Sequence, residues 1–323
     1  MFSFTIAVIT GLLLLIWSAD KFVDGAANLA RYWGVSPFII GALVVGLGTS
    51  APEMLVSAVA AFQGNTGIGI GNALGSNVTN ITLVLGATAL IANLPVRSEI
   101  VKKELPLILF VGLFSWMLMA DHILSRSDGL LLLGGLLLVL TWLVLSARQR
   151  HTVTDPLLKD SVSELPEVVP LKQSLVWTVV GLALLLISSK LLVWGASHIA
   201  QYYGVSDLLI GLTIVAIGTS LPELGASIAS VRKGDTDLAI GNIVGSNLFN
   251  NLGVLGIPAL FNPGQIPDGV LSRDVPVMIA ATLLLIILGY GLTSRSRYQI
   301  TRSCGVFFLM IFVAYQLLLY YQR

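Results

Sequence analysis

Residues 46–53 read Gly-Leu-Gly-Thr-Ser-Ala-Pro-Glu and lie inside an apolar segment long enough to cross a bilayer. A second copy, Ala-Ile-Gly-Thr-Ser-Leu-Pro-Glu, occupies residues 216–223, which is 170 residues later and in the same setting. An ionisable carboxylate at the centre of a membrane helix costs about 2.5 to 3.5 kcal/mol on insertion scales, so it needs a partner, a proton or a bound cation. We interpret Glu53 and Glu223 as the centre of a cation site.

The composition indicates an integral membrane protein. The chain is 55% hydrophobic and only 11% charged, whereas soluble domains carry about 25% charged residues. In a bilayer each span must satisfy its own backbone hydrogen bonds, so the apolar runs predict helices. Ten spans fit the sequence, at residues 3–30, 38–62, 68–92, 104–120, 127–146, 173–200, 208–231, 238–262, 275–293 and 303–321.

The sequence contains an internal repeat. With an offset of 170 residues, residues 23–90 align with 193–260 without a gap, and 31 of the 68 pairs are identical. Each half then holds five spans, and an odd number of spans in tandem forces the second copy to insert upside down. We expect an all-α polytopic membrane protein of ten transmembrane helices in two inverted five-helix repeats, at residues 1–146 and 173–323, joined by a cytoplasmic linker at 147–172. Such repeats are typical of transporters, whose substrate site lies at mid-membrane between the halves.

The distribution of positive charge predicts the orientation. If the spans alternate, 14 of the 18 lysines and arginines fall on one face and 4 on the other. The positive-inside rule places the richer face in the cytoplasm. Both termini are then outside the cytoplasm, in a multi-pass protein of the cell's inner (plasma) membrane. The net charge of +1 gives no reason to expect a nucleic-acid partner, and no protein partner is predicted.

The first motif places three oxygen-bearing side chains on one helix face. Thr49, Glu53 and Ser57 are four residues apart, and side chains at that spacing share a face. Pro52 has no N–H and its ring displaces a carbonyl of the preceding turn, so the helix should break just before Glu53. The same residues recur in the second half, as Thr219, Pro222, Glu223 and Ser227. A plain proline kink with a hydrogen-bonded glutamate is the structural alternative, and it does not explain why both copies keep the same polar residues.

A second motif follows each of the first. Residues 71–80 read Gly-Asn-Ala-Leu-Gly-Ser-Asn-Val-Thr-Asn and residues 241–250 read Gly-Asn-Ile-Val-Gly-Ser-Asn-Leu-Phe-Asn. Each contains an Asn, a Ser and an Asn at four-residue spacing, and the members are Asn72, Ser76, Asn80, Asn242, Ser246 and Asn250. The small residues between them favour close packing of helices. Packing would bring the polar stripes of the two halves face to face.

The available ligands favour hard cations. The one cysteine, Cys304, and the three histidines lie away from both motifs, which disfavours soft and borderline metals. Carboxylates, hydroxyls, amides and carbonyls suit calcium, which accepts six to eight oxygens in flexible geometry. Two glutamates balance one divalent ion or two monovalent ions, which is a basis for exchange. The ions are cargo, and no cofactor is expected.

The paired motifs in two inverted repeats resemble the alpha repeats of the sodium/calcium exchangers in the calcium/cation antiporter superfamily, and especially its bacterial YrbG-type members. The resemblance implies that Glu53, Glu223, Thr49 and Thr219 bind calcium. It also implies that the first and sixth spans slide across the others. The implied sodium sites add Ser76, Ser246 and the carbonyls of Gly46 and Ala216, with Asn80 and Asn250 at the centre. Many family members have Asp where this chain has Asn250, which leaves the sodium stoichiometry and any proton or potassium coupling open.

The sequence thus predicts a secondary antiporter that exchanges calcium for sodium across the membrane. Its partners are calcium ions, sodium ions and the lipid bilayer. The alternative in the same class is an antiporter of calcium, or another cation, for protons. A channel is a different class, and a trap of two carboxylates favours binding over passage. An enzyme is not expected, since no Ser-His-Asp or paired-Asp arrangement occurs in the spans.

Overall fold

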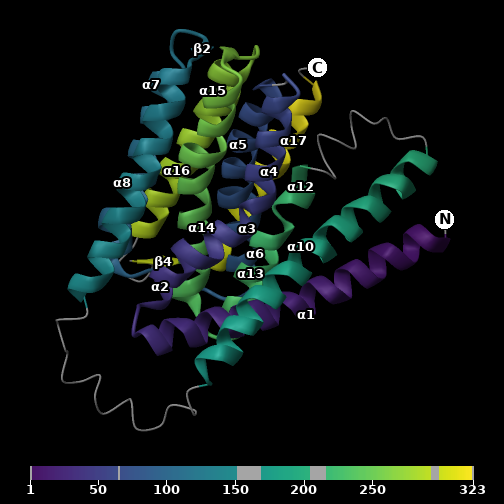
Figure 1. The fold of residues 1–323 in the computed structure, drawn as a ribbon, viewed down its shortest axis with the longest axis vertical. Helices are drawn as coiled ribbons and strands as arrows, with labels where there is room; N and C mark the ends of the chain where they lie inside the picture. The colour runs from purple at the N-terminus through teal and green to yellow at the C-terminus, as the bar shows by residue number, and fades with distance from the viewer. Residues whose placement is uncertain (1, 65, 151–168, 204–215, 292–297, 322–323) are drawn as a thin grey trace.

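The computed structural model describes residues 2–64, 66–150, 169–203, 216–291 and 298–321, and within them the chain is helical apart from two short strand pairs (Figure 1). The first half contains α1 (Phe2–Trp33), α2 (Pro37–Ile40), the π-helical turn η1 (Gly41–Val45), α3 (Gly46–Thr49), α4 (Ala51–Phe62), α5 (Thr66–Thr79), η2 (Asn80–Val84), α6 (Leu85–Ile91), β1 (Leu94–Pro95), η3 (Ile100–Glu104), α7 (Leu105–Leu118), β2 (Ile123–Leu124) and α8 (Arg126–Arg150). The second half contains α10 (Leu171–Tyr202), α12 (Ala216–Thr219), α13 (Leu221–Arg232), α14 (Thr236–Phe249), η6 (Asn250–Val254), α15 (Gly256–Phe261), β3 (Gly264–Gln265), η7 (Val270–Asp274), α16 (Val275–Tyr290), β4 (Gln299–Ile300) and α17 (Arg302–Tyr321).

Seven helices of the described chain are long and apolar enough to cross a membrane. The pair Pro37–Thr49 and Ala51–Phe62, bent by 42°, makes an eighth if it is one span. Two of the ten predicted spans fall outside this set. The segment formed by η3 and α7, residues 100–118, is long enough, but it begins with the charged residues Lys102, Lys103 and Glu104. The span predicted at 208–231 is described only from Ala216 onward.

Several predicted span ends differ from the helix ends by a few residues. Most of the predicted linker, residues 151–168, lies outside the described residues. The helix of α8 continues to Arg150, while its apolar span ends at Ser146, where the sequence predicted it. The extra residues are Ala-Arg-Gln-Arg, which are good helix formers and carry the helix beyond the apolar run. Helix α16 ends at Tyr290 instead of residue 293, because Gly291 takes a positive φ of 85° and so terminates the helix.

The bounds of the elements repeat with the same offset as the sequence. Adding 170 to the bounds of α3, α4, α5, η2, β1 and η3 gives those of α12, α13, α14, η6, β3 and η7. The short strands close the two ends of the bundle, with β1 antiparallel to β4 and β2 antiparallel to β3. Two copies of one structural unit therefore build the molecule.

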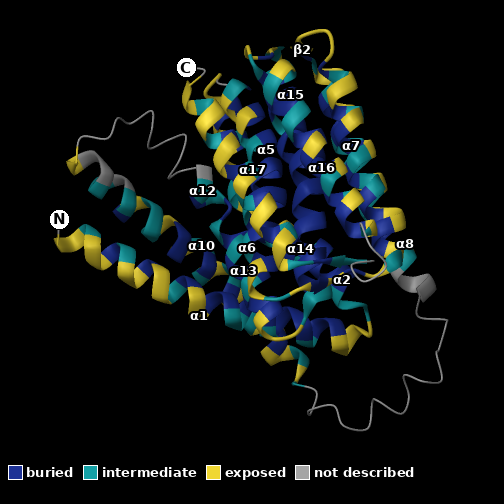
Figure 2. Cartoon of the chain, turned by 180° about the vertical axis from the view of Figure 1, so that it is seen from behind, coloured by how far each residue is buried: buried dark blue, intermediate teal, exposed yellow. Residues whose placement is uncertain are grey.

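Helices α5 and α14 lie at the centre of an upright bundle, while α1 and α10 form a long tilted pair beside it (Figure 1). Every residue of α14 from Leu238 to Phe249 is buried. The outer faces of α1, α8 and α17 are exposed and apolar (Figure 2), as expected for surfaces in contact with lipid. The polar motifs lie on the central helices, away from those faces.

Candidate functional site

Two broken helices position the glutamates. Helix α3 ends at Thr49, Ser50 leaves helical geometry with ψ of 3°, and α4 begins at Ala51 with Pro52 in its first turn. Ser220 and Pro222 repeat this arrangement between α12 and α13. Proline is tolerated at the first helical positions because the N–H there has no partner within the helix. The break thus comes three residues before each glutamate and leaves the glutamate in the first turn of the new helix.

Both glutamates are completely buried, with exposures of 0%. The Ser50 hydroxyl at the first break donates to Glu223 Oε1 over 3.2 Å, so the second glutamate reaches the break that precedes the first. The two carboxyl groups lie close enough for their charges to interact. The structure therefore brings the two acids, which are far apart in the sequence, into one interior region.

Several oxygens in this region have no hydrogen-bond partner in the described part of the chain. They include both carboxylate oxygens of Glu53 and Oε2 of Glu223. The amide groups of Asn80 and Asn250 likewise have no partner at either atom there. Each of these asparagines is buried and begins a π-turn, η2 or η6, and π-turns inside α-helices are frequent at functional sites. Burying polar atoms without partners is costly, so these oxygens are candidate ligands for a cation.

The remaining predicted residues surround this region. Thr49 is buried, and its hydroxyl bonds to the Val45 carbonyl and to Asn242 Oδ1 at 3.0 and 3.1 Å. The Ser246 hydroxyl lies 3.5 Å from the carbonyl oxygen of Gly46. A Cβ atom on Gly46 would lie 3.0 Å from the backbone nitrogen of Ser246, so the glycine permits this contact between the halves.

In the other half, Ser76 is buried in α5, and α12, which begins at Ala216, packs against that helix. Thr219 is only partly buried, in contrast to Thr49.

Two asparagines with a structural role were not among the predicted ligands. The Asn72 amide donates to the Glu53 carbonyl and the Ser57 hydroxyl at 2.9 and 3.1 Å. Asn242 makes the same two contacts in the second half, to Glu223 and Ser227 at 3.2 and 2.9 Å. Each asparagine therefore fixes the helix turn that carries a glutamate.

The Ser50 contact was also missed. The only sequence signal for this contact is a serine three residues before each glutamate. That spacing falls outside the four-residue pattern used to predict the ligands.

The chemistry of the donors fits a hard cation. Among the described residues, no group of three or more His, Cys, Asp and Glu side chains is placed to hold a metal ion. A cation at the glutamates would therefore complete its shell with hydroxyl, amide and carbonyl oxygens, which are the ligands of calcium and of other hard ions.

Comparison with known proteins agrees with this fold. A family model described as sodium/calcium exchanger protein matches residues 3–149 and 173–321. The chain is 51% identical to the putative antiporter CaxA of Alkalimonas amylolytica over 98% of each chain. It is 41% identical to the inner membrane protein YrbG of Escherichia coli over 98% of this chain and 97% of the relative. A solved structure of the sodium-calcium exchanger NCX_Mj, soaked with Na⁺ and Sr²⁺, matches with a TM-score of 0.82 and 33% identity over 97% of both chains.

The fold and the buried carboxylate centre define a multi-pass membrane transport protein rather than an enzyme. The chain belongs to the sodium/calcium exchanger family and is a cation exchanger of that family.

Proposed function

We propose that this protein is a secondary active antiporter that exchanges calcium for sodium by alternating access around a mid-membrane site built on Glu53 and Glu223. The observation that carries the proposal is the burial of two carboxylates, of which Glu223 reaches the helix break before Glu53 and which have three oxygens without a hydrogen-bond partner in the described chain. A calcium ion or two sodium ions would neutralise both charges. Binding of either calcium or sodium therefore removes the electrostatic cost that prevents the empty site from switching between the two sides of the membrane.

The proposed calcium ligands are the carboxylates of Glu53 and Glu223 with oxygens of Thr49 and Thr219. The proposed sodium ligands add Ser76, Ser246 and the carbonyls of Gly46 and Ala216, with the Asn80 and Asn250 amides at the centre. The contact between Ser246 and the Gly46 carbonyl supports this grouping, as do the unpartnered amides of the two asparagines.

The proposed architecture is ten spans in two inverted repeats, residues 1–146 and 173–323, with a cytoplasmic linker between them. The recurrence of element bounds at an offset of 170 residues supports the repeat, and the two matched halves of the family model flank the linker. Both termini would lie outside the cytoplasm. The relative YrbG is an inner membrane protein, which supports the same membrane here.

Ion-gradient transport tests the proposal directly. The purified protein is reconstituted into liposomes loaded with sodium, which are then diluted into sodium-free buffer containing radioactive calcium. We expect calcium uptake that requires the outward sodium gradient and disappears when sodium is equal on both sides. Protein-free liposomes and a sodium ionophore added to the reconstituted protein are the controls. Uptake of equal size with and without the sodium gradient would refute the coupling.

Protons are a second candidate counter-ion. The two carboxylates are buried, and three of their four oxygens have no hydrogen-bond partner in the described chain, so protons could replace sodium in neutralising their charges. In the same liposomes, a proton-coupled exchanger would take up calcium in response to a pH gradient and ignore sodium. The two arms of this experiment therefore separate the two antiporters.

A further inference from the structure

Helices α1 and α10 form one body. A Cβ atom added at Gly181 of α10 would lie 2.6 Å from the Phe22 nitrogen of α1, and one at Gly11 of α1 would lie 2.9 Å from the Leu192 nitrogen of α10. Contacts this close require glycine at both crossings. The pair is thus joined backbone to backbone, while it lies beside the bundle that holds the glutamates (Figure 1).

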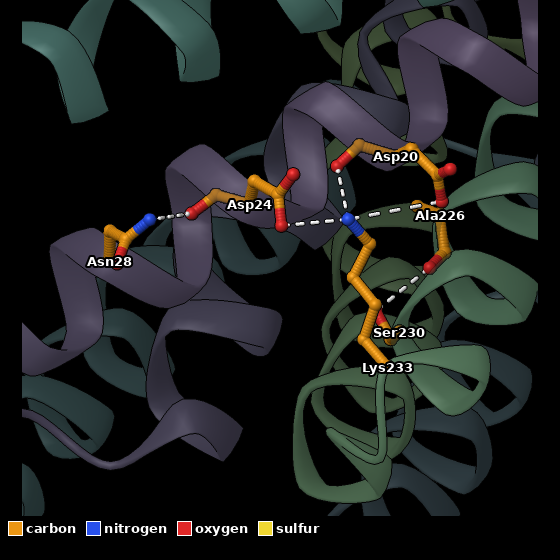
Figure 3. Close-up of polar contacts among 6 residues, drawn as sticks. All are labelled: Asp20, Asp24, Asn28, Ala226, Ser230 and Lys233. Carbon is orange, nitrogen blue, oxygen red and sulfur yellow. Dashed lines mark hydrogen bonds and ion pairs between the residues drawn. The ribbon is translucent and has the colours of Figure 1, made fainter. Parts of the chain in front are cut away.

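At one end of this pair, α1 is tied to the bundle by a lysine. Lys233 directly follows α13, and its Nζ lies 2.7 Å from Asp24 Oδ1, 3.0 Å from the Asp20 carbonyl and 3.9 Å from Asp20 Oδ1 (Figure 3). The Asn28 side chain donates to the Asp24 carbonyl from one turn further along α1. The ammonium group therefore bridges one turn of α1 to the end of α13.

Other charges surround this bridge. Asp235 lies in the loop after Lys233, and burial raises its pKa, while the charges of Arg31 and Lys233 oppose that rise. The side chains of Lys233 and Asp24 are 26% and 45% exposed. The bridge is therefore partly hydrated and of modest strength, as is typical of ion pairs near a surface.

The residues at the repeat-related positions cannot form the same bridge. The residues at the repeat-related positions of Asp20, Asp24 and Lys233 are Lys190, Trp194 and Gln63. These residues cannot form an ion pair. Most of the residues around the glutamates are repeated, whereas this bridge exists on one side only.

Helices α13 and α4 also differ in their packing against α1. Ala226 and Ala229 of α13 pack with Ala19, Phe22 and Val23 of α1 and are 0% and 4% exposed. The repeat-related residues of α4, Val56 and Val59, are 37% and 45% exposed. Helix α13 is thus covered by α1, whereas the corresponding face of α4 is exposed.

We propose that Lys233, Asp24 and Asp20 form a one-sided latch that stabilises the conformer in which α1 is closed onto α13. The inference rests on the proposed function, because alternating access requires a second conformer in which this end opens. Opening separates Lys233 from α1 and breaks the bridge, and the repeat-related residues Lys190, Trp194 and Gln63 cannot form the same pair in return. The latch therefore biases the equilibrium between the two access states toward closure at this end, which the charge distribution predicts to be cytoplasmic.

Cysteine labelling measures this bias without any transport. In a Cys304→Ser background, Ala229→Cys and Ala226→Cys are labelled separately with a maleimide in lipid nanodiscs, where both faces are accessible. If opening precedes labelling, the rate follows the open fraction. Surface ion pairs are worth enough to change that fraction about two- to fivefold. We expect Lys233→Gln and Asp24→Asn to accelerate labelling at both probes by this factor, and Asp20→Asn to have less effect because its carboxylate is farther away.

The controls isolate the bridge. Arg232→Gln removes the neighbouring exposed positive charge and should leave both rates unchanged. The exchanged pair Lys233→Asp with Asp24→Lys should restore slow labelling. Unchanged rates in Lys233→Gln, or acceleration at Ala229→Cys alone, would overturn the latch, since the latter indicates fraying of the helix end. Sodium-driven calcium uptake is measured in parallel, and its absence in the unaltered protein would refute the proposed function without affecting the labelling result.

Discussion

Helices α4 and α13 carry the same Pro-Glu motif in the same register, yet they have different surroundings. Contacts toward the molecular interior are duplicated, because Asn72 holds the Glu53 turn just as Asn242 holds the Glu223 turn. Contacts toward the tilted helix pair are not duplicated, because α1 covers α13 whereas the matching face of α4 is exposed. The turns that carry the two glutamates are therefore held in the same way, while α1 covers only one of the two helices that contain them.

The side chains at the two faces fit this difference. Residues 226 and 229 of α13 are alanines, and residues 56 and 59 of α4 are valines. Small side chains let helix backbones approach closely in a membrane. Repeated glutamates with unequal outer faces would let the proposed exchanger favour one of its two access states.

The largest expected effect should be equal in the two halves. Glu53→Gln and Glu223→Gln each remove one of the two buried charges that hold the cation, so each should abolish sodium-driven calcium uptake, with a loss of at least about 100-fold. That loss corresponds to about 2.7 kcal/mol, which is within the range for a charged hydrogen-bonding ligand. Uptake into proteoliposomes is the measurement, and Asp268→Asn, an exposed loop acid, is the control. Full activity in either glutamate variant would mean that the halves do not share one site.

A smaller effect should differ between the halves. In the Cys304→Ser background, Val59→Cys should react with a maleimide at least about tenfold faster than Ala229→Cys, because the second probe lies beneath α1. Protection of this kind reflects the free energy of local opening. Labelling in nanodiscs, followed by mass spectrometry, gives the two rates. Equal rates would mean that the two faces are covered equally in the membrane and would remove the asymmetry described above.

Much of the fold could be predicted from the sequence, since it follows from local signals. The apolar runs mark the helices, the offset of 170 residues marks the repeat, and Pro52 with Pro222 marks the breaks. The burial of Glu53 close to Glu223 could also be predicted from the sequence, because two carboxylates at membrane depth need a positive charge that neutralises both. Hydropathy marked the end of the α8 span at Ser146, but it does not show that the helix itself continues to Arg150.

The long-range contacts could not be predicted. The Asn72 and Asn242 side chains were expected as polar stripe members, and the structure uses them to hold the backbone of the glutamate turns. Which oxygens meet across the two halves depends on helix rotation and crossing angle, which periodicity alone leaves undetermined. The covering of α13 rather than α4 likewise depends, in the proposed mechanism, on which of two access states the chain adopts, and local sequence signals do not determine that.

The smallest expected effect concerns the serines at the two helix breaks. Ser50 donates to Glu223 Oε1, while the Ser220 hydroxyl is buried without a partner in the described chain. Ser50→Ala removes a hydrogen bond to a charged group, worth about 1.5 kcal/mol, and leaves the Glu223 carboxylate less well held. We expect Ser50→Ala to weaken calcium binding about tenfold and Ser220→Ala to change it less than about twofold.

Calcium-dependent thermal stabilisation of the purified protein measures binding without transport, because a ligand that binds only the folded state raises its melting temperature. Equal losses in the two variants would mean that both serines contact the acids during binding, so that the asymmetry between the helix breaks disappears once the ion is bound.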